Sequence, residues 1–291
     1  MRNASFITAL SLFVAVTACG QKAPSETDMA ASPCHAGEAA LAADDPENAV
    51  AGLEACLESR ELDPEREAIV HSQLGGAYLY LDRYEEALRE FDLAYAIAET
   101  QGTTLNSPYV RRNRGIARYR TERLDGALSD LEQAARELPD DMLTHLNLGS
   151  VYQTMERPAE AVAAFDTVTR LEPSWPSGWI ARSGALLELG MYEAAIDDAR
   201  RAVELDPESG FALNALCWSL IENDQAAAAL PLCEQAVAAE PEIGAIVHSL
   251  ASALEDVGRT EEAYPLFAQA FELTPDSEEI EADYRRTHPE R

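Results

Sequence analysis

Apolar residues recur three and four positions apart along most of this chain, which is the spacing of an amphipathic helix, and from Pro108 the pattern itself repeats every 34 residues. Each unit has two such stretches and a turn near its fifteenth residue, and in the five units from Pro108 a proline ends the second stretch. The pattern predicts an all-α chain built from helix pairs. The units begin at Ala68, Pro108, Met142, Pro176, Gly210 and Gly244, with a six-residue insertion near residues 100–106.

Small residues recur at unit positions 8 and 20, counted from the first residue of each unit. They allow the two helices of a pair to approach closely, and since no single pair has a complete core, neighbouring pairs must stack. The residues at position 8 are Gly75, Gly115, Gly149, Ser183, Cys217 and Ala251, and position 20 is alanine in every unit.

These residues, with the sequence Leu148-Gly149-Ser150-Val151-Tyr152 as an example, resemble the tetratricopeptide repeat over roughly two thirds of the chain. The resemblance implies a superhelical solenoid of antiparallel helix pairs, in which the first helices line a concave face that binds extended segments of other proteins. The expected domains are a signal peptide (1–18), a flexible tether (19–35), an N-terminal helical hairpin (36–66), six repeat units (67–275), and a capping helix with the C-terminal tail (276–291).

The N-terminus predicts export. Met1-Arg2-Asn3 is short and basic, residues 6–16 are apolar but too few to span a bilayer, and Val16-Thr17-Ala18 precedes Cys19. This resembles a bacterial lipoprotein signal, which implies cleavage before Cys19 and a lipid on that cysteine. Gly20 resembles the residue found in lipoproteins sorted to the outer membrane, facing the periplasm. The alternative is an ordinary secretory signal cut after Ala18, which would give a soluble periplasmic protein.

The other four cysteines are expected to pair in an oxidising compartment. Cys217 and Cys233 are equidistant from a turn near residues 223–224, and Cys34 and Cys56 are placed alike about Asp45-Pro46, a predicted N-cap and first helical residue. The spacing predicts two disulfides, Cys34–Cys56 and Cys217–Cys233. The alternative is four buried free cysteines that act as small apolar residues.

The chain is strongly acidic, with 52 acidic and 22 basic residues and a net charge of −30. This charge argues against binding to nucleic acid and favours basic partners through long-range steering. The alternative interpretation is that acidic residues simply solvate a long array of helices. No stretch after the signal is apolar over the roughly 18 residues that a membrane helix needs, so membrane contact is expected through the lipid alone.

The sequence carries no recognisable catalytic or metal-binding motif. Its five histidines are scattered, and it contains neither His-Glu-x-x-His, Cys-x-x-Cys, a Gly-rich phosphate loop nor Gly-x-Ser-x-Gly. Residues 44–48 look like a calcium loop but lack its glycine, and fit a helix turn and cap better. We therefore expect no enzyme activity, cofactor, metal or small-molecule substrate.

The resemblance assigns unit positions 2, 5, 9, 12 and 13 to the concave face. In the fifth unit these positions carry two aromatic side chains, Phe211 and Trp218, and Asn214, whose amide can hold the backbone of a ligand. The pattern predicts a partner-binding hot spot, and the alternative is that Trp218 packs within the fold. The remaining residues expected there are Ile221 and Glu222, flanked by Ile180 and His248.

Six arginines lie within residues 111–123. By unit position, three face neighbouring helices and are expected to pair with acids: Arg111, Arg114 and Arg118, with Glu86, Glu90 or Asp130.

Arg112 falls on the concave face with Tyr119 and Arg120 nearby, and together with Asn147 it resembles part of the carboxylate clamp of chaperone-binding members of the family. The rest of that clamp is missing, because Ile116, Ser177 and Ala181 stand at its other positions. We do not expect clamp activity, but an anionic ligand group can still dock near Arg112, Tyr119 and Asn147.

The sequence thus predicts a non-enzymatic, protein-binding adaptor of the bacterial cell envelope that holds a protein or peptide partner in a concave groove. The alternative is a structural component of an outer-membrane secretion or polysaccharide-export assembly, in which the convex surface and the acidic charge matter more. Substitutions in the groove separate the two, since only the adaptor should lose its partner.

Overall fold

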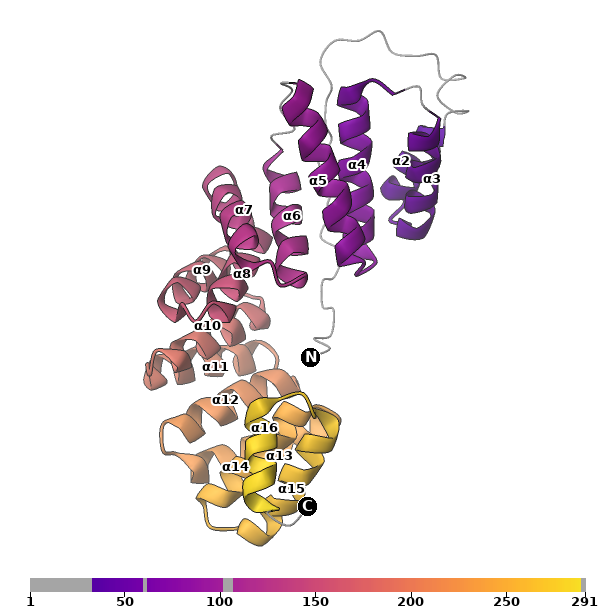
Figure 1. Cartoon of the computed structure of the whole chain (residues 1–291). Helices are drawn as coiled ribbons and strands as arrows, with labels where there is room; N and C mark the ends of the chain where they lie inside the picture. Colours follow the sequence, from indigo (N-terminus) through magenta and orange to yellow (C-terminus); the bar gives the residue numbers. More distant parts are fainter. Residues whose placement is uncertain (1–32, 60–61, 102–106, 289–291) are drawn as a thin grey trace. The chain divides into compact units, whose positions relative to one another are not determined.

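The computed structural model describes residues 33–59, 62–101 and 107–288, and all regular secondary structure within these ranges is α-helical (Figure 1). The all-α prediction is confirmed. The predicted signal peptide, Cys19 and most of the tether lie outside the described residues. The described residues form two compact units, 33–147 and 148–288.

Helix pairs follow one another in both units. The first unit contains α2 (Pro33–Ala42), α3 (Pro46–Glu58), α4 (Pro64–Tyr80), α5 (Tyr84–Gln101), α6 (Pro108–Arg120) and α7 (Leu124–Glu137), and α8 (Met142–Thr154) contains the boundary. The second contains α9 (Pro158–Leu171), α10 (Pro176–Glu188), α11 (Tyr192–Leu205), α12 (Gly210–Glu222), α13 (Ala226–Ala239), α14 (Gly244–Asp256), α15 (Thr260–Leu273) and α16 (Glu278–Thr287).

Two of the predicted domain boundaries differ from the helix bounds in the structure. α2 already begins at Pro33, inside the segment expected to be a tether, and the boundary expected at residue 66 falls within α4. The side chain of Asp63 accepts a hydrogen bond from the Arg66 N–H at 2.9 Å, and Pro64 occupies the first turn. This cap starts α4 before the repeat pattern becomes visible in the sequence.

Every helix pair turns through a residue with positive φ at the same place. In the six repeat units this residue is at unit position 15, and in the N-terminal hairpin it is Asp44. The next N–H reaches back five residues to a helix carbonyl, as from Gln225 to Leu220 at 2.8 Å, which is the Schellman C-cap. The residues in the repeat units are Asp82, Glu122, Glu156, Gly190, Asp224 and Gly258.

Complementary side-chain sizes set the distance between the two helices of a pair. A Cβ added to Gly149 would lie 2.4 Å from the Phe165 ring, and one added to Gly115 would lie 2.8 Å from Leu131 Cγ. The small residue at position 8 therefore receives the bulky residue at position 24 of the same pair. In the fifth pair these two positions hold Cys217 and Cys233 instead.

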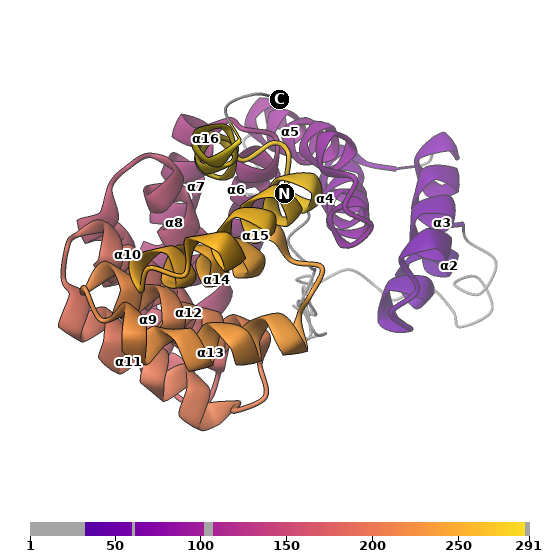
Figure 2. The same ribbon diagram turned by 90° about the horizontal axis from the view of Figure 1, so that it is seen from below.

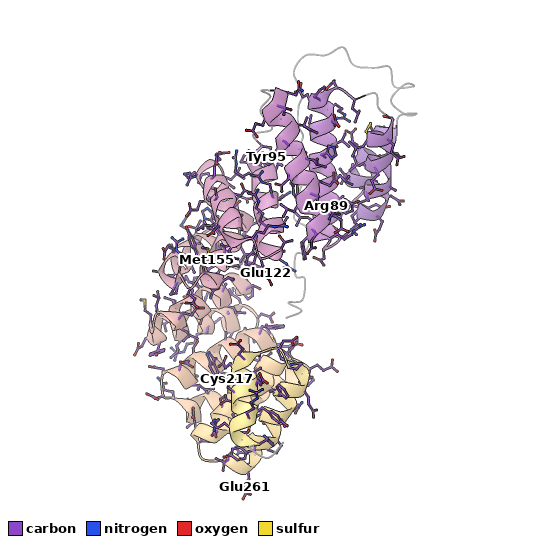
Figure 3. The ribbon with its side chains drawn as sticks, viewed as in Figure 1. Arg89, Tyr95, Glu122, Met155, Cys217 and Glu261 are labelled. Carbon is purple, nitrogen blue, oxygen red and sulfur yellow. A yellow bond between two sulfur atoms is a disulfide. The ribbon has the colours of Figure 1, made fainter. Side chains whose placement is uncertain are left out.

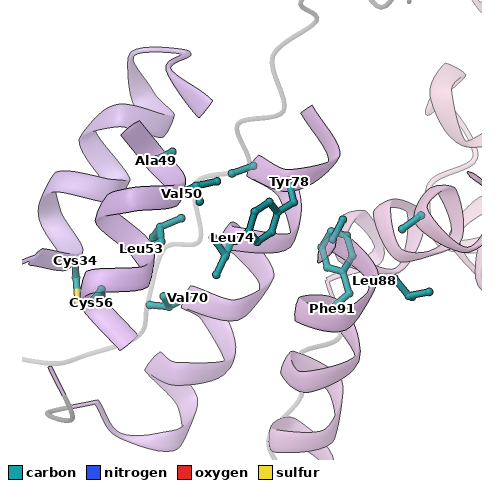
Figure 4. Packing of buried hydrophobic residues seen from close by; sticks show 13 residues of the cluster. Cys34, Ala49, Val50, Leu53, Cys56, Val70, Leu74, Tyr78, Leu88 and Phe91 are labelled. Atoms are coloured by element: carbon teal, nitrogen blue, oxygen red, sulfur yellow. A yellow bond between two sulfur atoms is a disulfide. The ribbon is translucent and has the colours of Figure 1, made fainter. Parts of the chain in front are cut away.

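The N-terminal hairpin packs on α4 through a continuous apolar cluster (Figure 4). Leu53 of α3 is fully buried in the same cluster as Leu74 of α4 and Phe91 of α5. The structure joins Cys34 to Cys56, with 4.5 Å between their Cα atoms, and Cys217 to Cys233, with 5.4 Å. Both pairings are the predicted ones.

In the second unit the helices from α9 to α15 follow one another in chain order (Figure 2). The first helices of successive pairs, α10, α12 and α14, contact one another, and each also contacts the second helix of the preceding pair. α16 packs at the end of this array, where Ile280 is buried with Val247 of α14 and Ala270 of α15. The predicted capping helix around residues 277–286 is present.

Candidate functional site

One side of α12 is left incompletely buried. Ser209 caps the helix by accepting a hydrogen bond from the Ala212 N–H at 3.3 Å. On the buried side, Cys217, which Figure 3 labels, is fully enclosed with Leu213 and Leu220. The other side, called the α12 face below, consists of Phe211, Asn214, Ala215, Trp218, Ile221 and Glu222.

The aromatic residues of the α12 face differ in exposure. Phe211 is 42% exposed, which is high for an aromatic side chain. Trp218 is half-buried, with its ring 6.0 Å from that of His248. The ring of His248 in turn meets Phe267 edge to face at 5.5 Å. One side of the Trp218 ring thus packs within the fold, and the rest is presented on the α12 face. Trp218 therefore fits both interpretations of the sequence, packing within the fold and a place in a partner-binding hot spot.

His248 does not lie on an open surface. Only 5% of the residue is exposed, and its Nε2 lies 2.9 Å from Oδ2 of Asp283 on α16. The prediction that His248 contacts a partner is therefore wrong. The repeat pattern could not reveal this, because α16 is not a repeat unit and its contacts with α14 have no counterpart elsewhere in the sequence.

Asn214 lies between the two aromatic residues on α12. Its Oδ1 is buried and has no hydrogen-bond partner among the described residues. An amide oxygen in this state is costly in a folded protein, so the polar side chain of Asn214 is not explained by the packing of α12 alone.

Carboxylates gather where the α12 face ends. Burial, and then the charges of Glu279 and Asp256, raise the pKa of Glu222. Burial, followed by Glu255 and Asp224, likewise raises the pKa of Asp256. Glu222, Asp256 and Glu279 come from α12, α14 and α16. Sequence reasoning found only Glu222, although the same rule selects Asp256, which occupies position 13 of the sixth unit.

The three α6 arginines expected to face neighbouring helices are paired with acids. Arg114 and Arg118 share Asp130 at 2.7 and 2.8 Å, and Arg114 also stacks on Tyr95, labelled in Figure 3, at 3.7 Å. Arg111 binds Glu137 at 2.7 Å. The predicted pairing with Asp130 is confirmed. Pairing with Glu86 or Glu90 is wrong, since these bind Arg83 and His71.

The second predicted site, around Arg112 and Asn147, is not assembled. Arg112 is only 4% exposed and donates to Asp141 at 3.1 Å and to the side chain of Asn113. Asn147 donates to the Leu143 carbonyl of its own helix at 2.8 Å, and Tyr119 is half-buried on α6. The prediction that an anion docks on Arg112 is wrong, because Asp141 from the loop before α8 already neutralises it.

Two other features are absent from residues 33–59, 62–101 and 107–288. No group of three or more His, Cys, Asp or Glu side chains is arranged to hold a metal ion there. The helices in these ranges include none with the length and hydropathy required to cross a membrane.

Comparison with known proteins agrees with the geometry. Residues 142–285 match a family model described as tetratricopeptide repeat. The chain also matches Protein STIP1 homolog of Dictyostelium discoideum with 23% identity over 96 residues, which is 33% of this chain and 17% of that relative. The chain therefore spans a small part of that relative's length.

Solved structures are similar to this protein over a larger share of the chain. A tetratricopeptide repeat protein of Parabacteroides merdae ATCC 43184 is similar with a TM-score of 0.67 and 14% identity, covering 88% of this chain and 97% of that one. TTC0263, a thermophilic TPR protein of Thermus thermophilus, has a TM-score of 0.54 and 21% identity, covering 63% and 100%. Residues 142–285 are therefore similar to tetratricopeptide repeats, and the chain folds as an all-α solenoid of antiparallel helix pairs.

Proposed function

We propose that this protein is a non-enzymatic adaptor of the bacterial cell envelope that holds a segment of a partner protein against the α12 face. Arrays of helical repeats commonly bind proteins on the surface formed by successive equivalent helices. The observation that carries the proposal is the exposed ring of Phe211 on the same face of α12 as the partly fixed ring of Trp218.

The neighbouring helix offers a contrast. At the positions equivalent to Phe211 and Trp218, α10 carries Ser177 and Gly184. Aromatic anchors that are held on one side and exposed on the other are typical of the few residues that dominate a protein interface. The α12 face is thus the part of this surface best suited to binding.

The test compares capture of the partner by Phe211→Ala, Trp218→Ala and wild-type protein, with Tyr264→Ala as control. Tyr264 is an aromatic residue of similar exposure, 38%, on α15. Loss of an anchor commonly costs about 2 kcal/mol, or roughly thirtyfold in affinity. We expect that loss for Phe211→Ala and Trp218→Ala, with unchanged circular dichroism, and none for Tyr264→Ala.

The outcome also separates the adaptor from a structural component of an outer-membrane assembly. If both α12 variants fold and retain the partner, the assembly role is favoured and the adaptor is contradicted. Should Trp218→Ala unfold, Phe211→Ala still decides, because so much of the Phe211 ring is already exposed.

We infer in addition that a lipid on Cys19 anchors the protein to the outer membrane, facing the periplasm. The stretch Val16-Thr17-Ala18-Cys19-Gly20 supports this, and the two disulfide pairings suit an oxidising compartment. Cys19→Ser is expected to move the protein from the membrane fraction to a soluble exported pool. A wild-type N-terminal peptide that carries no lipid in mass spectrometry would contradict the anchor.

A further inference from the structure

The α12 face joins an apolar end to an acidic end. Phe211 lies in the first turn of α12, Trp218 and Ile221 follow on the same side, and Glu222 is the last residue of the helix. Asp256, the last residue of α14, and Glu279, in the first turn of α16, lie near this end. A ligand that runs along α12 therefore passes from aromatic rings to carboxylates.

The three carboxylates have no cationic partner within the described part of the chain. Among the described residues, no ion pair includes Glu222, Asp256 or Glu279. The nearby basic residues are already engaged, since Arg286 binds Glu255 and Asp283, and His248 also binds Asp283. All three residues are exposed, and unpaired like charges that lie close together repel one another, so a cation placed among them relieves that repulsion.

The neighbouring helix leaves room for a ligand's main chain. Apart from the backbone of its own helix and its chain neighbours, a Cβ added to Gly184 of α10 would have only Gln153 Nε2 within 4 Å, at 3.8 Å. Gly184 occupies the position equivalent to Trp218, and α10 contacts α12. A main chain can therefore come close to α10 next to the α12 face.

We propose that the occupant of the α12 face is a segment of a partner protein in which an apolar side chain is followed by Lys or Arg. The apolar side chain packs on Phe211 and Trp218, and the cations bind among Glu222, Asp256 and Glu279. This inference rests on the proposed function and adds the chemistry of the partner. Charge complementarity favours such a segment, and the net charge of −30 accelerates its approach.

The experiment selects peptides from a random 12-residue library displayed on phage, using full-length soluble protein that carries Cys19→Ser. Selected peptides are synthesised together with analogues in which each Lys or Arg is replaced by Gln, and binding is measured by fluorescence anisotropy. We expect the basic peptides to bind about tenfold tighter than their Gln analogues at about 0.1 M salt. The difference should shrink at about 1 M salt, where the Debye length falls to about 3 Å.

A charge-matched control identifies the carboxylates. Glu222→Gln/Asp256→Asn should remove the preference for the basic peptide, whereas Glu208→Gln/Glu242→Gln, which removes two exposed charges elsewhere in the same unit, should keep it. Peptides that require Phe211 but lack Lys and Arg would overturn this inference and leave the proposed function standing. A selection that yields no peptide dependent on Phe211 or Trp218 would contradict both.

Discussion

Two repeat pairs bury an arginine–aspartate pair where most of the others place apolar side chains. Arg114 binds Asp130 at 2.7 Å and Arg182 binds Asp198 at 2.7 Å, in each case from unit position 7 to position 23. Each arginine also contacts an aspartate at position 25 of the preceding pair, Asp92 or Asp166. The apolar equivalents at positions 7 and 23 are Leu148 with Ala164, Leu216 with Leu232, and Leu250 with Leu266.

The difference between charged and apolar pairs at positions 7 and 23 leads to a prediction about the free energy of unfolding. Arg182→Leu leaves the Asp198 carboxylate, which is only 8% exposed, without its cation, so the free energy of unfolding should fall by about 3 kcal/mol. Arg182→Leu/Asp198→Leu should recover most of that loss, because it recreates the leucine pair of the fifth and sixth units. Urea unfolding measures both variants, and a double variant no more stable than the single one would contradict this view of the pair.

A second prediction concerns the turn residues. An L-residue with positive φ costs roughly 1–2 kcal/mol more than glycine, which has no Cβ to clash. Glu122 has a φ of 61° and Gly190 one of 69°. Glu122→Gly should therefore raise the free energy of unfolding by up to about 1 kcal/mol, and Gly190→Ala should lower it by about 1 kcal/mol. Unfolding curves that move in the opposite directions would rule out this explanation.

Repeat position predicted which side chains point away from the core, and it did so well for Phe211, Asn214 and Trp218, none of which is buried. Repeat position failed to predict exposure where a residue outside the repeat pattern covers or pairs with the side chain. Asp141 lies in the loop before α8 and pairs with Arg112, and Asp283 lies on the non-repeat helix α16 and covers His248. A periodic pattern carries no information about such partners.

At the scale of elements, α16 is held to the last repeat pair by three kinds of contact. Ile280 is buried against Val247 and Ala270, Asp283 accepts from His248, and Arg286 binds Glu255 at 2.7 Å. Its start was predictable because Ser277 caps the helix by accepting a hydrogen bond from the Ile280 N–H. The place where α16 packs was not predictable, because helix periodicity predicts which side of a helix is apolar but not which neighbouring helix that side contacts.

The attachment of α16 should depend on pH. Burial acts to raise the pKa of Asp283, but the hydrogen bonds from His248 and Arg286 together outweigh it and lower the pKa. A carboxyl with a lowered folded pKa stabilises the fold above its unfolded pKa of about 3.9, and this contribution is lost as the pH falls through the folded value. Amide hydrogens of α16 should therefore exchange faster, relative to those of α14, below about pH 4.

Asp283→Asn provides the matching control, because it keeps the shape of the side chain and removes the titrating group. The variant should show faster exchange in α16 already at pH 7 and a weaker dependence on acid. If exchange in α16 is the same in the variant and the wild type at pH 7, the contact between His248 and Asp283 does not hold the helix.

For the whole molecule, the sequence predicted the repeat architecture because each unit repeats the same packing problem, with a small residue at position 8 opposite position 24. It predicted both cysteine pairings for the same reason, since residues equidistant from a turn face each other in a helix pair. It also placed the partner-binding hot spot on the fifth unit, but it did not rank the surfaces by their exposure or by the charges around them. That ranking depends on exposure and on neighbouring charge, which combine at the α12 face.

Site-specific photo-crosslinking can show whether a partner protein binds at the α12 face. The photoreactive residue p-benzoylphenylalanine replaces Phe211 in one variant, and Tyr264 or Leu93, exposed by 38% and 46%, in two controls. Irradiated envelopes are then examined for adducts. We expect a defined adduct from position 211 that is absent from positions 264 and 93. Adducts from either control position with none from position 211 would contradict binding at the α12 face.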